Sequence, residues 1–202
     1  PKQGENLINN LHSLLSQTLA KHPGLMGKEI LFKVNDINFD TITLYSDKSS
    51  RMRLFTELGL PVPLIVRKYS TTVYDFTPVV KPEDIKYLSD VDLMISYGPT
   101  ENDPAAVAAL QNSSTYGQIP AVKKGRVAVL GDKTPLSDLS SPTPLSIPWG
   151  IDRYFDLLEK AAAHPPLART RRPDLRRRVV ERLPRDSSPG VAHAMPYAGE
   201  LA

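Results

Sequence analysis

Apolar positions near the start of the chain recur at intervals of three and four residues: Leu7, Ile8, Leu11, Leu14, Leu15 and Leu19. This spacing predicts an amphipathic helix over residues 5–21, which His22-Pro23-Gly24 ends. Residues 29–34 and 40–45 are instead rich in Ile, Phe, Val, Thr and Tyr, with the turn-prone Asn35-Asp36 between them. They predict two strands that are neighbours in one sheet.

Helices and strands alternate along the chain up to residue 162. A helix capped by Ser49 or Ser50 and ended by Gly59 precedes a short helix that begins at Pro82. The pattern then predicts a strand over 91–97, a helix over 104–111, a strand over 126–130 and a last helix with the apolar stripe Ile151, Tyr154, Phe155 and Leu158. Residues 131–148, rich in proline and serine, predict a long loop. The alternation predicts an α/β fold with a doubly wound, mostly parallel sheet and helices on both faces.

The composition limits the chemistry that the chain can perform. Its 202 residues, 41% of them apolar, suffice for one substantial α/β domain. It has no cysteine, which excludes disulfides, thiolate metal sites and cysteine nucleophiles.

No apolar run approaches the ~20 residues of a membrane span. The chain starts at Pro1 without a basic or apolar leader, so we expect a secretory signal to have been removed or to lie upstream.

The net charge of +3 is unevenly distributed. Residues 164–202 contain eight arginines and four acidic residues, which gives this part +4 and leaves residues 1–163 at −1. Proline, arginine, serine and glycine dominate after residue 163, which predicts a mobile tail rich in Arg and Pro. Clustered arginines alone are weak evidence for nucleic-acid binding, so we predict no nucleic-acid partner.

Catalytic and metal-binding motifs are missing from the sequence. The four histidines, His12, His22, His164 and His193, do not have the spacing of metal ligands. No glycine-rich dinucleotide loop, phosphate-binding loop or G-x-S-x-G motif occurs. We therefore predict no catalytic residue, no metal site and no enzymatic activity.

Three segments resemble one family. They are the IPAVKKGRV turn at 119–127 that leads into a late strand, the closing helix with its Ile151-Asp152 pair, and the segment 81–98 that joins KPEDI to DVDLM. Together they resemble the C-terminal lobe of the iron–siderophore substrate-binding proteins of ABC importers. The resemblance implies an interlobe helix and linker over 1–27, a C-terminal binding lobe over 28–163, and an N-terminal lobe absent from this chain.

The resemblance also implies a function. We expect the partial substrate-binding component of an importer for ferric siderophores, which lies outside the cytoplasm, in a periplasm or as a lipoprotein on the outer face of the membrane. Its partners would be an ABC permease and the ferric siderophore. The chelator would hold the iron, so no cofactor is expected.

Candidate ligand residues follow from chemistry and from the resemblance. Residues 66–76 form a loop-rich stretch that combines cations and phenols, which suit bulky, often anionic ferric chelates. Tyr45 and Arg51 flank the exit of the second strand and could face the same cleft. Trp149, the sole tryptophan, is a candidate for the cleft wall or for packing, whereas Tyr97 and Tyr116 are expected to be structural. The predicted ligand set is Tyr45, Arg51, Arg67, Lys68, Tyr69, Tyr74 and Trp149.

Glu83 stands where the family presents a glutamate to the arginines of the permease, so the resemblance implies a docking role for it. A carboxylate early in a helix is also favoured by the helix dipole, which is the alternative explanation. Asp84 is the neighbouring candidate for docking.

Other functions remain open at this point. Haem and cobalamin receptors share the expected architecture. An enzyme or regulatory domain on a Rossmann-like sheet would need a glycine-rich loop after the first strand, and residues 33–37 contain no glycine. A structural α/β module with a basic tail is the third possibility.

Overall fold

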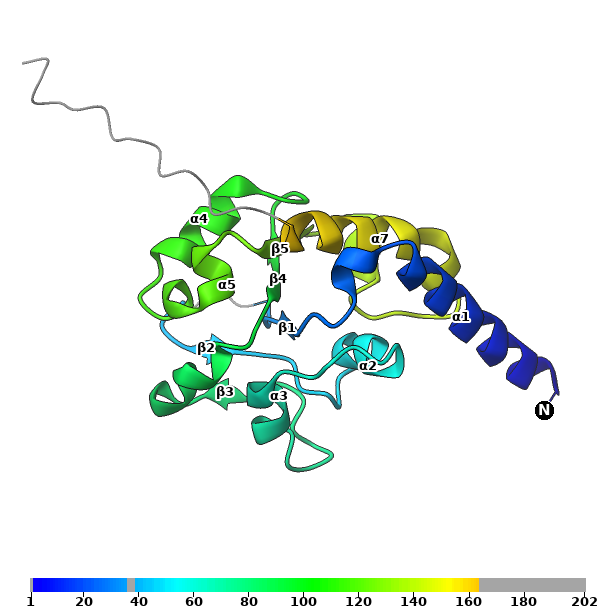
Figure 1. Ribbon diagram of the computed structural model, residues 1–202, viewed down its shortest axis with the longest axis horizontal. Helices are drawn as coiled ribbons and strands as arrows, with labels where there is room; N and C mark the ends of the chain where they lie inside the picture. The colour runs from blue at the N-terminus through cyan, green and yellow to red at the C-terminus, as the bar shows by residue number, and fades with distance from the viewer. Residues whose placement is uncertain (1, 36–38, 164–202) are drawn as a thin grey trace, which may run out of the picture. The chain divides into compact units, whose positions relative to one another are not determined.

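The computed structural model describes residues 2–35 and 39–163. Figure 1 shows a layer of strands with helices to either side. The predicted tail over 164–202 lies outside the described residues, and its expected character stays a prediction. The proposed division at residue 27 likewise stays a prediction.

A three-stranded parallel sheet forms the centre of the fold. It consists of β1 (Ile30–Phe32), β4 (Leu93–Gly98) and β5 (Val127–Gly131) in the order β1-β4-β5. Ile30 lies opposite Leu93, and Met94 lies opposite Val127. These strands are almost continuously buried, as expected for a parallel sheet covered on both faces.

Helices cover both faces of this sheet. After β4 the chain runs through α4 (Pro104–Asn112), the short 3₁₀ turn η3 (Tyr116–Gln118) and α5 (Pro120–Lys123) before it enters β5. Figure 1 shows α4 and α5 on one side of the strands and α7 (Ser146–Ala162) on the other. The predicted α/β fold with a parallel sheet flanked by helices is confirmed.

The second strand differs from its prediction. Its core, β2 (Ile42–Thr43), pairs antiparallel with β3 (Val79–Val80), which the sequence did not indicate. The segment still lies beside β1, because the Tyr45 N–H donates to the Phe32 carbonyl at 2.8 Å and the Val34 N–H donates to the Thr43 carbonyl at 3.0 Å. The expected neighbours are therefore adjacent, but they belong to two sheets.

Three helical segments lie in the connection between β2 and β4. The first, α2 (Ser50–Glu57), is capped by the Ser49 side chain as predicted and ends before Gly59, whose φ is +75°. The next, α3 (Leu64–Tyr69), corrects the expectation of a loop-rich stretch at its start. Asp90 accepts a hydrogen bond from the Leu64 N–H at 3.1 Å, which stabilises the first turn of α3 from a distant position in the chain. The 3₁₀ helix η2 (Pro82–Leu88) begins at the predicted proline.

The long loop predicted for 131–148 is partly helical. It contains α6 (Pro135–Asp138), and α7 starts at Ser146 inside the expected loop. Proline is compatible with the first turn of a helix, and Thr134 and Ser137 bond to backbone carbonyls three residues earlier. The proline-rich composition therefore marked helix starts as well as loop. Gly131 lies in register with Gly98, where β5 and β4 both end.

The N-terminal helix α1 (Lys2–Ala20) is followed by a segment that makes polar contacts with α7. After the helix, η1 (Pro23–Leu25) turns the chain toward β1. Glu159 of α7 accepts a hydrogen bond from the Gly24 N–H at 2.6 Å and contacts the buried His22 imidazole Nδ1 at 3.1 Å. The end of α1 is thereby fixed to the lobe, while Leu7 and Ile8 near its start are about half exposed.

Candidate functional site

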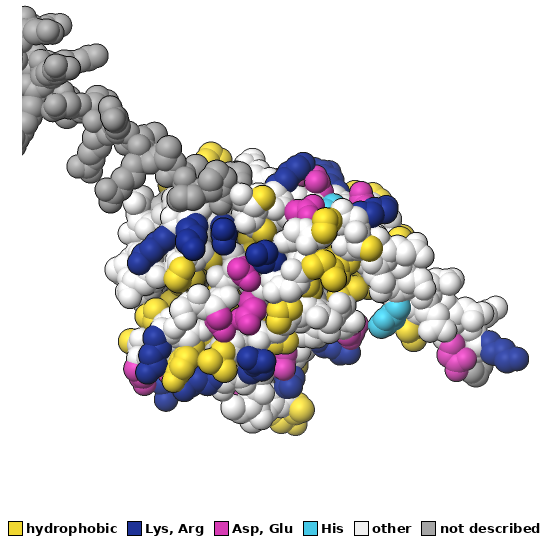
Figure 2. Space-filling view, viewed as in Figure 1, with side chains coloured by type: hydrophobic (Ala, Val, Ile, Leu, Met, Phe, Trp, Pro, Cys, Tyr) yellow, Lys and Arg dark blue, Asp and Glu magenta, His cyan; other side chains and the backbone are white. Residues whose placement is uncertain are grey.

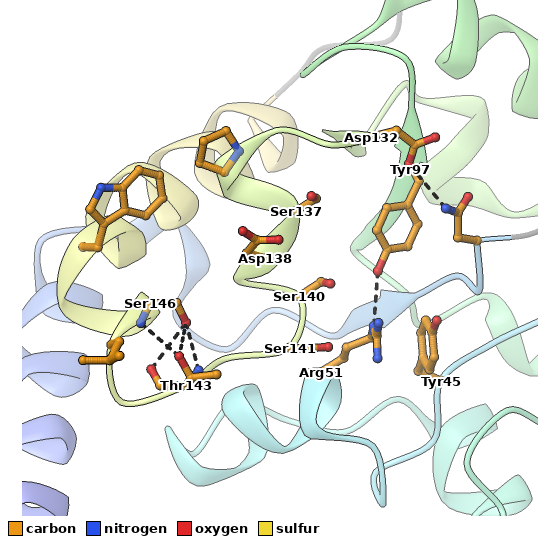
Figure 3. Close-up of a pocket in the computed structure, with 14 residues that line it drawn as sticks. Tyr45, Arg51, Tyr97, Asp132, Ser137, Asp138, Ser140, Ser141, Thr143 and Ser146 are labelled. Atoms are coloured by element: carbon orange, nitrogen blue, oxygen red, sulfur yellow. Dashed lines mark hydrogen bonds between the residues drawn. The ribbon is translucent and has the colours of Figure 1, made fainter.

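A cavity of about 800 Å³ lies at the carboxyl ends of β4 and β5. This is the edge of an open α/β sheet where ligands usually bind. Its walls come from the β2 exit, the start of α2, the end of β4 and the stretch from β5 to α7. Figure 3 shows the lining residues, which are Asn35, Tyr45, Arg51, Tyr97, Asp132, Pro135, Ser137, Asp138, Ser140, Ser141, Thr143, Leu145, Ser146 and Trp149.

Arg51 is the cation among the described residues that line this cavity, and two tyrosines contact its side chain. Its Nε donates a hydrogen bond to the Tyr97 hydroxyl at 3.2 Å. Its guanidinium carbon lies 4.3 Å from the centroid of the Tyr45 ring, a cation–π distance. Figure 3 shows the arginine between these two side chains. Among the described residues, no carboxylate lies within ion-pair distance of Arg51, so its charge is available to a ligand.

Buried aromatic rings support this arrangement from below. The Phe32 ring packs edge-to-face against Tyr45 at 5.5 Å and lies 5.7 Å from the Tyr97 ring. Tyr154 of α7 is fully buried nearby, and burial raises the pKa of its phenol far above the ordinary value. Tyr97 raises the pKa further and Arg51 opposes the shift, so Tyr154 stays a neutral packing group.

The opposite wall is polar, and its rim is apolar. The Asn35 side chain donates to Asp132 at 3.3 Å, and Ser146 and Thr143 bond reciprocally at the start of α7. Trp149 is 58% exposed and Leu145 87% exposed. Large exposed apolar side chains beside a polar pocket provide contact area for a ligand.

The structure brings three of the predicted ligand residues together. Tyr45, Arg51 and Trp149 all line the cavity. Trp149 is mostly exposed rather than packed, which favours the cleft-wall alternative for its position. Their function as ligand residues remains a proposal.

The other predicted ligand residues do not line the cavity. Tyr69 donates to Asp84 at 2.8 Å, and Lys68 forms an ion pair with the same carboxylate at 3.2 Å and lies over the Tyr87 ring. Arg67 is exposed at the end of α3, and Tyr74 is 83% exposed in the following loop. Although these four residues are close in sequence, Lys68 and Tyr69 contact Asp84, whereas Arg67 and Tyr74 face solvent.

The two candidates for docking to the permease, Glu83 and Asp84, differ in exposure. Glu83 is exposed in the first turn of η2, whereas the adjacent Asp84 is buried. The hydrogen bond from Tyr69, and after it the contact with Lys68, keeps the pKa of Asp84 below its ordinary value. Asp84 therefore anchors α3 to η2, and Glu83 is the carboxylate that reaches the surface.

Sequence reasoning missed Tyr97 and the acids of the cavity. Tyr97 was expected to be structural, yet its hydroxyl reaches the cavity from the end of β4. Asp132 and Asp138 come from the stretch that was predicted to be loop. Their place in the sequence could have identified Tyr97 and Asp132 as cavity residues, because both stand at the carboxyl ends of adjacent parallel strands.

The surface carries charges of both signs. On the face drawn in Figure 2, basic and acidic side chains lie close to one another with hydrophobic side chains between them.

In residues 2–35 and 39–163, no group of three or more potential ligands could hold a metal ion. No helix in that same part is both long and apolar enough to cross a membrane.

The comparison with solved structures gives the class of protein. The chain is similar to PiaA from Streptococcus pneumoniae TIGR4 in complex with ferrichrome, with 33% identity and a TM-score of 0.71 over 81% of this chain and 54% of that one. It shares the fold of FhuD2 from Staphylococcus aureus with bound ferrioxamine B, at 14% identity and a TM-score of 0.55 over 80% of this chain and 59% of that one. A periplasmic solute-binding protein from Mycobacterium smegmatis has 18% identity and a TM-score of 0.58 over 80% of this chain and 51% of that one.

The predicted resemblance to iron–siderophore substrate-binding proteins of ABC importers is confirmed. PiaA is an iron-uptake substrate-binding protein, and the similar structures are binding proteins. The chain spans about half the length of PiaA. No family model matches the chain, and no curated protein matches it.

Proposed function

We propose that the chain is the C-terminal lobe of the substrate-binding component of an ABC importer for ferric siderophores. One observation carries the proposal: the Arg51 guanidinium is held by Tyr97 and Tyr45 on the wall of a large cavity, without a carboxylate partner among the described residues. The 33% identity to a ferrichrome-binding receptor supports the same ligand class.

The charges of the cavity favour a neutral chelate. Among the described residues, one cation, Arg51, lines it together with two carboxylates, Asp132 and Asp138. A ferric tris-catecholate carries three negative charges and would meet unfavourable potentials beside both acids. A ferric trihydroxamate is neutral and presents oxygen acceptors to the arginine and apolar surface to Trp149.

The mechanism is capture without chemistry. The chelator keeps the iron, so the protein needs neither a cofactor nor a catalytic group. The aromatic side chains supply contact area, and the guanidinium orients the ligand by donating to its oxygens. The loaded receptor would then deliver the complex to a permease on the outer side of the cell membrane.

The exposed position of Glu83 supports its proposed role in docking to the permease. We expect Glu83→Ala to leave ferrichrome binding unchanged but to lower uptake by cells whose ferrichrome import depends on this lobe. Glu57→Ala, which removes another exposed carboxylate, is the matched control. Equal uptake with both variants would contradict the docking role.

A titration tests the proposed function. Ferrichrome added to the chain should quench the fluorescence of Trp149, its only tryptophan. One lobe covers about one wall of a pocket, so we expect saturation only at millimolar ligand, since losing ~4 kcal/mol of contacts weakens a micromolar site about a thousandfold. A soluble ferric tris-catecholate, haemin and cobalamin should quench less at equal concentration.

Matched variants make the result specific. Arg51→Ala should weaken the quench to a small but measurable fraction at equal ferrichrome concentration, whereas Arg67→Ala, which removes an exposed arginine away from the cavity, should leave it unchanged. Quenching that is equal in both variants, or that is stronger with haemin, would contradict the proposal.

A further inference from the structure

The contact between Arg51 and Tyr97 joins two elements that are remote in the sequence. Arg51 stands in the first turn of α2, and Tyr97 stands one residue before the end of β4. The Tyr97 hydroxyl accepts the Nε–H of Arg51 at 3.2 Å. Tyr97 of β4 lies in register with Leu130 of β5, so pairing with that strand fixes the backbone that carries the acceptor.

The choice of a phenol as partner has an electrostatic consequence. A half-buried arginine is usually paired with a carboxylate, which orients the side chain and also neutralises it. A tyrosine hydroxyl accepts a hydrogen bond without contributing a negative charge. Asp132 and Asp138 line the same cavity but do not lie within ion-pair distance of Arg51.

The two contacts also leave a defined set of donors. Tyr45 covers one face of the guanidinium at 4.3 Å, and Tyr97 occupies the Nε–H. The terminal amino groups, Nη1 and Nη2, then remain to donate to a ligand. A planar pair of donors fits two oxygen acceptors at once, as in a hydroxamate or carbonyl-bearing chelate.

We infer that Tyr97 is a positioning residue that orients Arg51 for oxygen ligands while leaving its charge in place. This inference rests on the proposed function, because it assigns Arg51 to ligand binding. Tyr97 acts through the arginine, and the ligand need not contact its hydroxyl.

The substitution Tyr97→Phe tests the inference, because it removes the hydroxyl and keeps the ring against Phe32. In the unliganded chain, the Arg51 Nε–H signal in nitrogen-15 NMR should shift and exchange faster with solvent. Ferrichrome affinity should fall about tenfold, the effect of losing one hydrogen bond to a charged group. Tyr74→Phe, at an 83% exposed position outside the cavity, should change neither quantity.

A double-mutant cycle separates positioning from a general structural effect. In the Arg51→Ala background, Tyr97→Phe should cause no further loss of affinity, because the hydroxyl then has nothing to orient. Equal losses in both backgrounds, or an unchanged Nε–H signal in folded Tyr97→Phe, would overturn the inference. If Tyr97→Phe binds ferrichrome normally while Arg51→Ala does not, the positioning role fails and the proposed function stands. If the parent chain binds no ferric chelate, the proposed function fails, and the NMR signal alone still decides whether Tyr97 orients Arg51.

Discussion

The Tyr69 hydroxyl donates a hydrogen bond of 2.8 Å to the buried carboxylate of Asp84, and the same hydroxyl accepts the Lys81 N–H at 2.8 Å. Tyr69 thus connects α3 to both ends of the turn that begins η2. Burial, opposed by the contact with the Lys81 N–H and reinforced by Asp84, raises the pKa of the phenol, so it stays a donor at neutral pH. These contacts support a structural role for Tyr69.

Tyr69→Phe should lower the melting temperature without changing ferrichrome binding. The buried Asp84 loses its phenol donor, and we expect a decrease of about 2–6 °C for a domain of this size. Scanning calorimetry and the Trp149 titration measure the two effects. An unchanged melting temperature with weakened binding would return Tyr69 to the ligand site.

Glu29 predicts a dependence of stability on pH. Burial, followed by a hydrogen bond and repulsion from Asp90, raises the pKa of Glu29 from 4.5 to about 7, although Arg67 opposes the shift. The folded state therefore binds this proton more tightly than the unfolded state. Its stabilising contribution is fully present below about pH 4.5 and is lost as the pH rises through about 7.

Glu29→Gln should remove this dependence. Since the side chain is partly exposed, we expect the variant to be more stable than the parent at pH 8 by only about 1–2 kcal/mol, measured by urea unfolding. Glu5→Gln in the exposed part of α1 is the control. A parent curve that is flat between pH 5 and pH 8 would contradict the prediction.

Glu159 of α7 contacts the segment that follows α1. Glu159→Ala removes the acceptor for the Gly24 N–H and the nearer of the two carboxylates beside His22, so we expect a loss of about 1–3 kcal/mol of unfolding free energy. Hydrogen exchange should increase at the end of α1 and in η1. Asp156→Ala, which loses only an exposed pair with Lys160 on the same helix, should stay near the parent. Equal exchange in both variants would show that apolar packing alone holds α1.

Trp149 should contribute to binding but little to stability. Because the side chain is 58% exposed, Trp149→Ala should shift the melting temperature by no more than about 2 °C. Its ring supplies contact area, so ferrichrome affinity, followed by NMR with the gallium complex, should fall about tenfold. A large fall in the melting temperature would identify Trp149 as a packing residue instead.

The sequence predicted the elements whose signal is local. The apolar runs of β1, β4 and β5, the cap at Ser49 and the end of α2 at Gly59 all follow from neighbouring residues. The two-residue strand β3 was missed because Val79 and Val80 are too short a run to produce a pattern.

The candidate site was predictable only in part, because side-chain partners are remote in sequence. Tyr45, Arg51 and Trp149 were named from chemistry and resemblance, and the fold brings them to one cavity. Lys68 and Tyr69 have the same chemistry, but Asp84, 15 or 16 positions later, occupies them. No local pattern distinguishes the Tyr97 hydroxyl in a cavity from a tyrosine in a core.

The paired glycines at the strand ends set a limit for anyone who would redesign this cavity for another metal chelate. A Cβ atom at Gly98 would lie 2.8 Å from Val129 Cγ1, and one at Gly131 would lie 2.8 Å from the backbone nitrogen of Glu101. Both positions border the residues that a combinatorial library would vary, Tyr97 and Asp132. Diversity can therefore be introduced on either side of these two positions, whereas a larger residue at 98 or 131 would force Val129 or the backbone at Glu101 to shift.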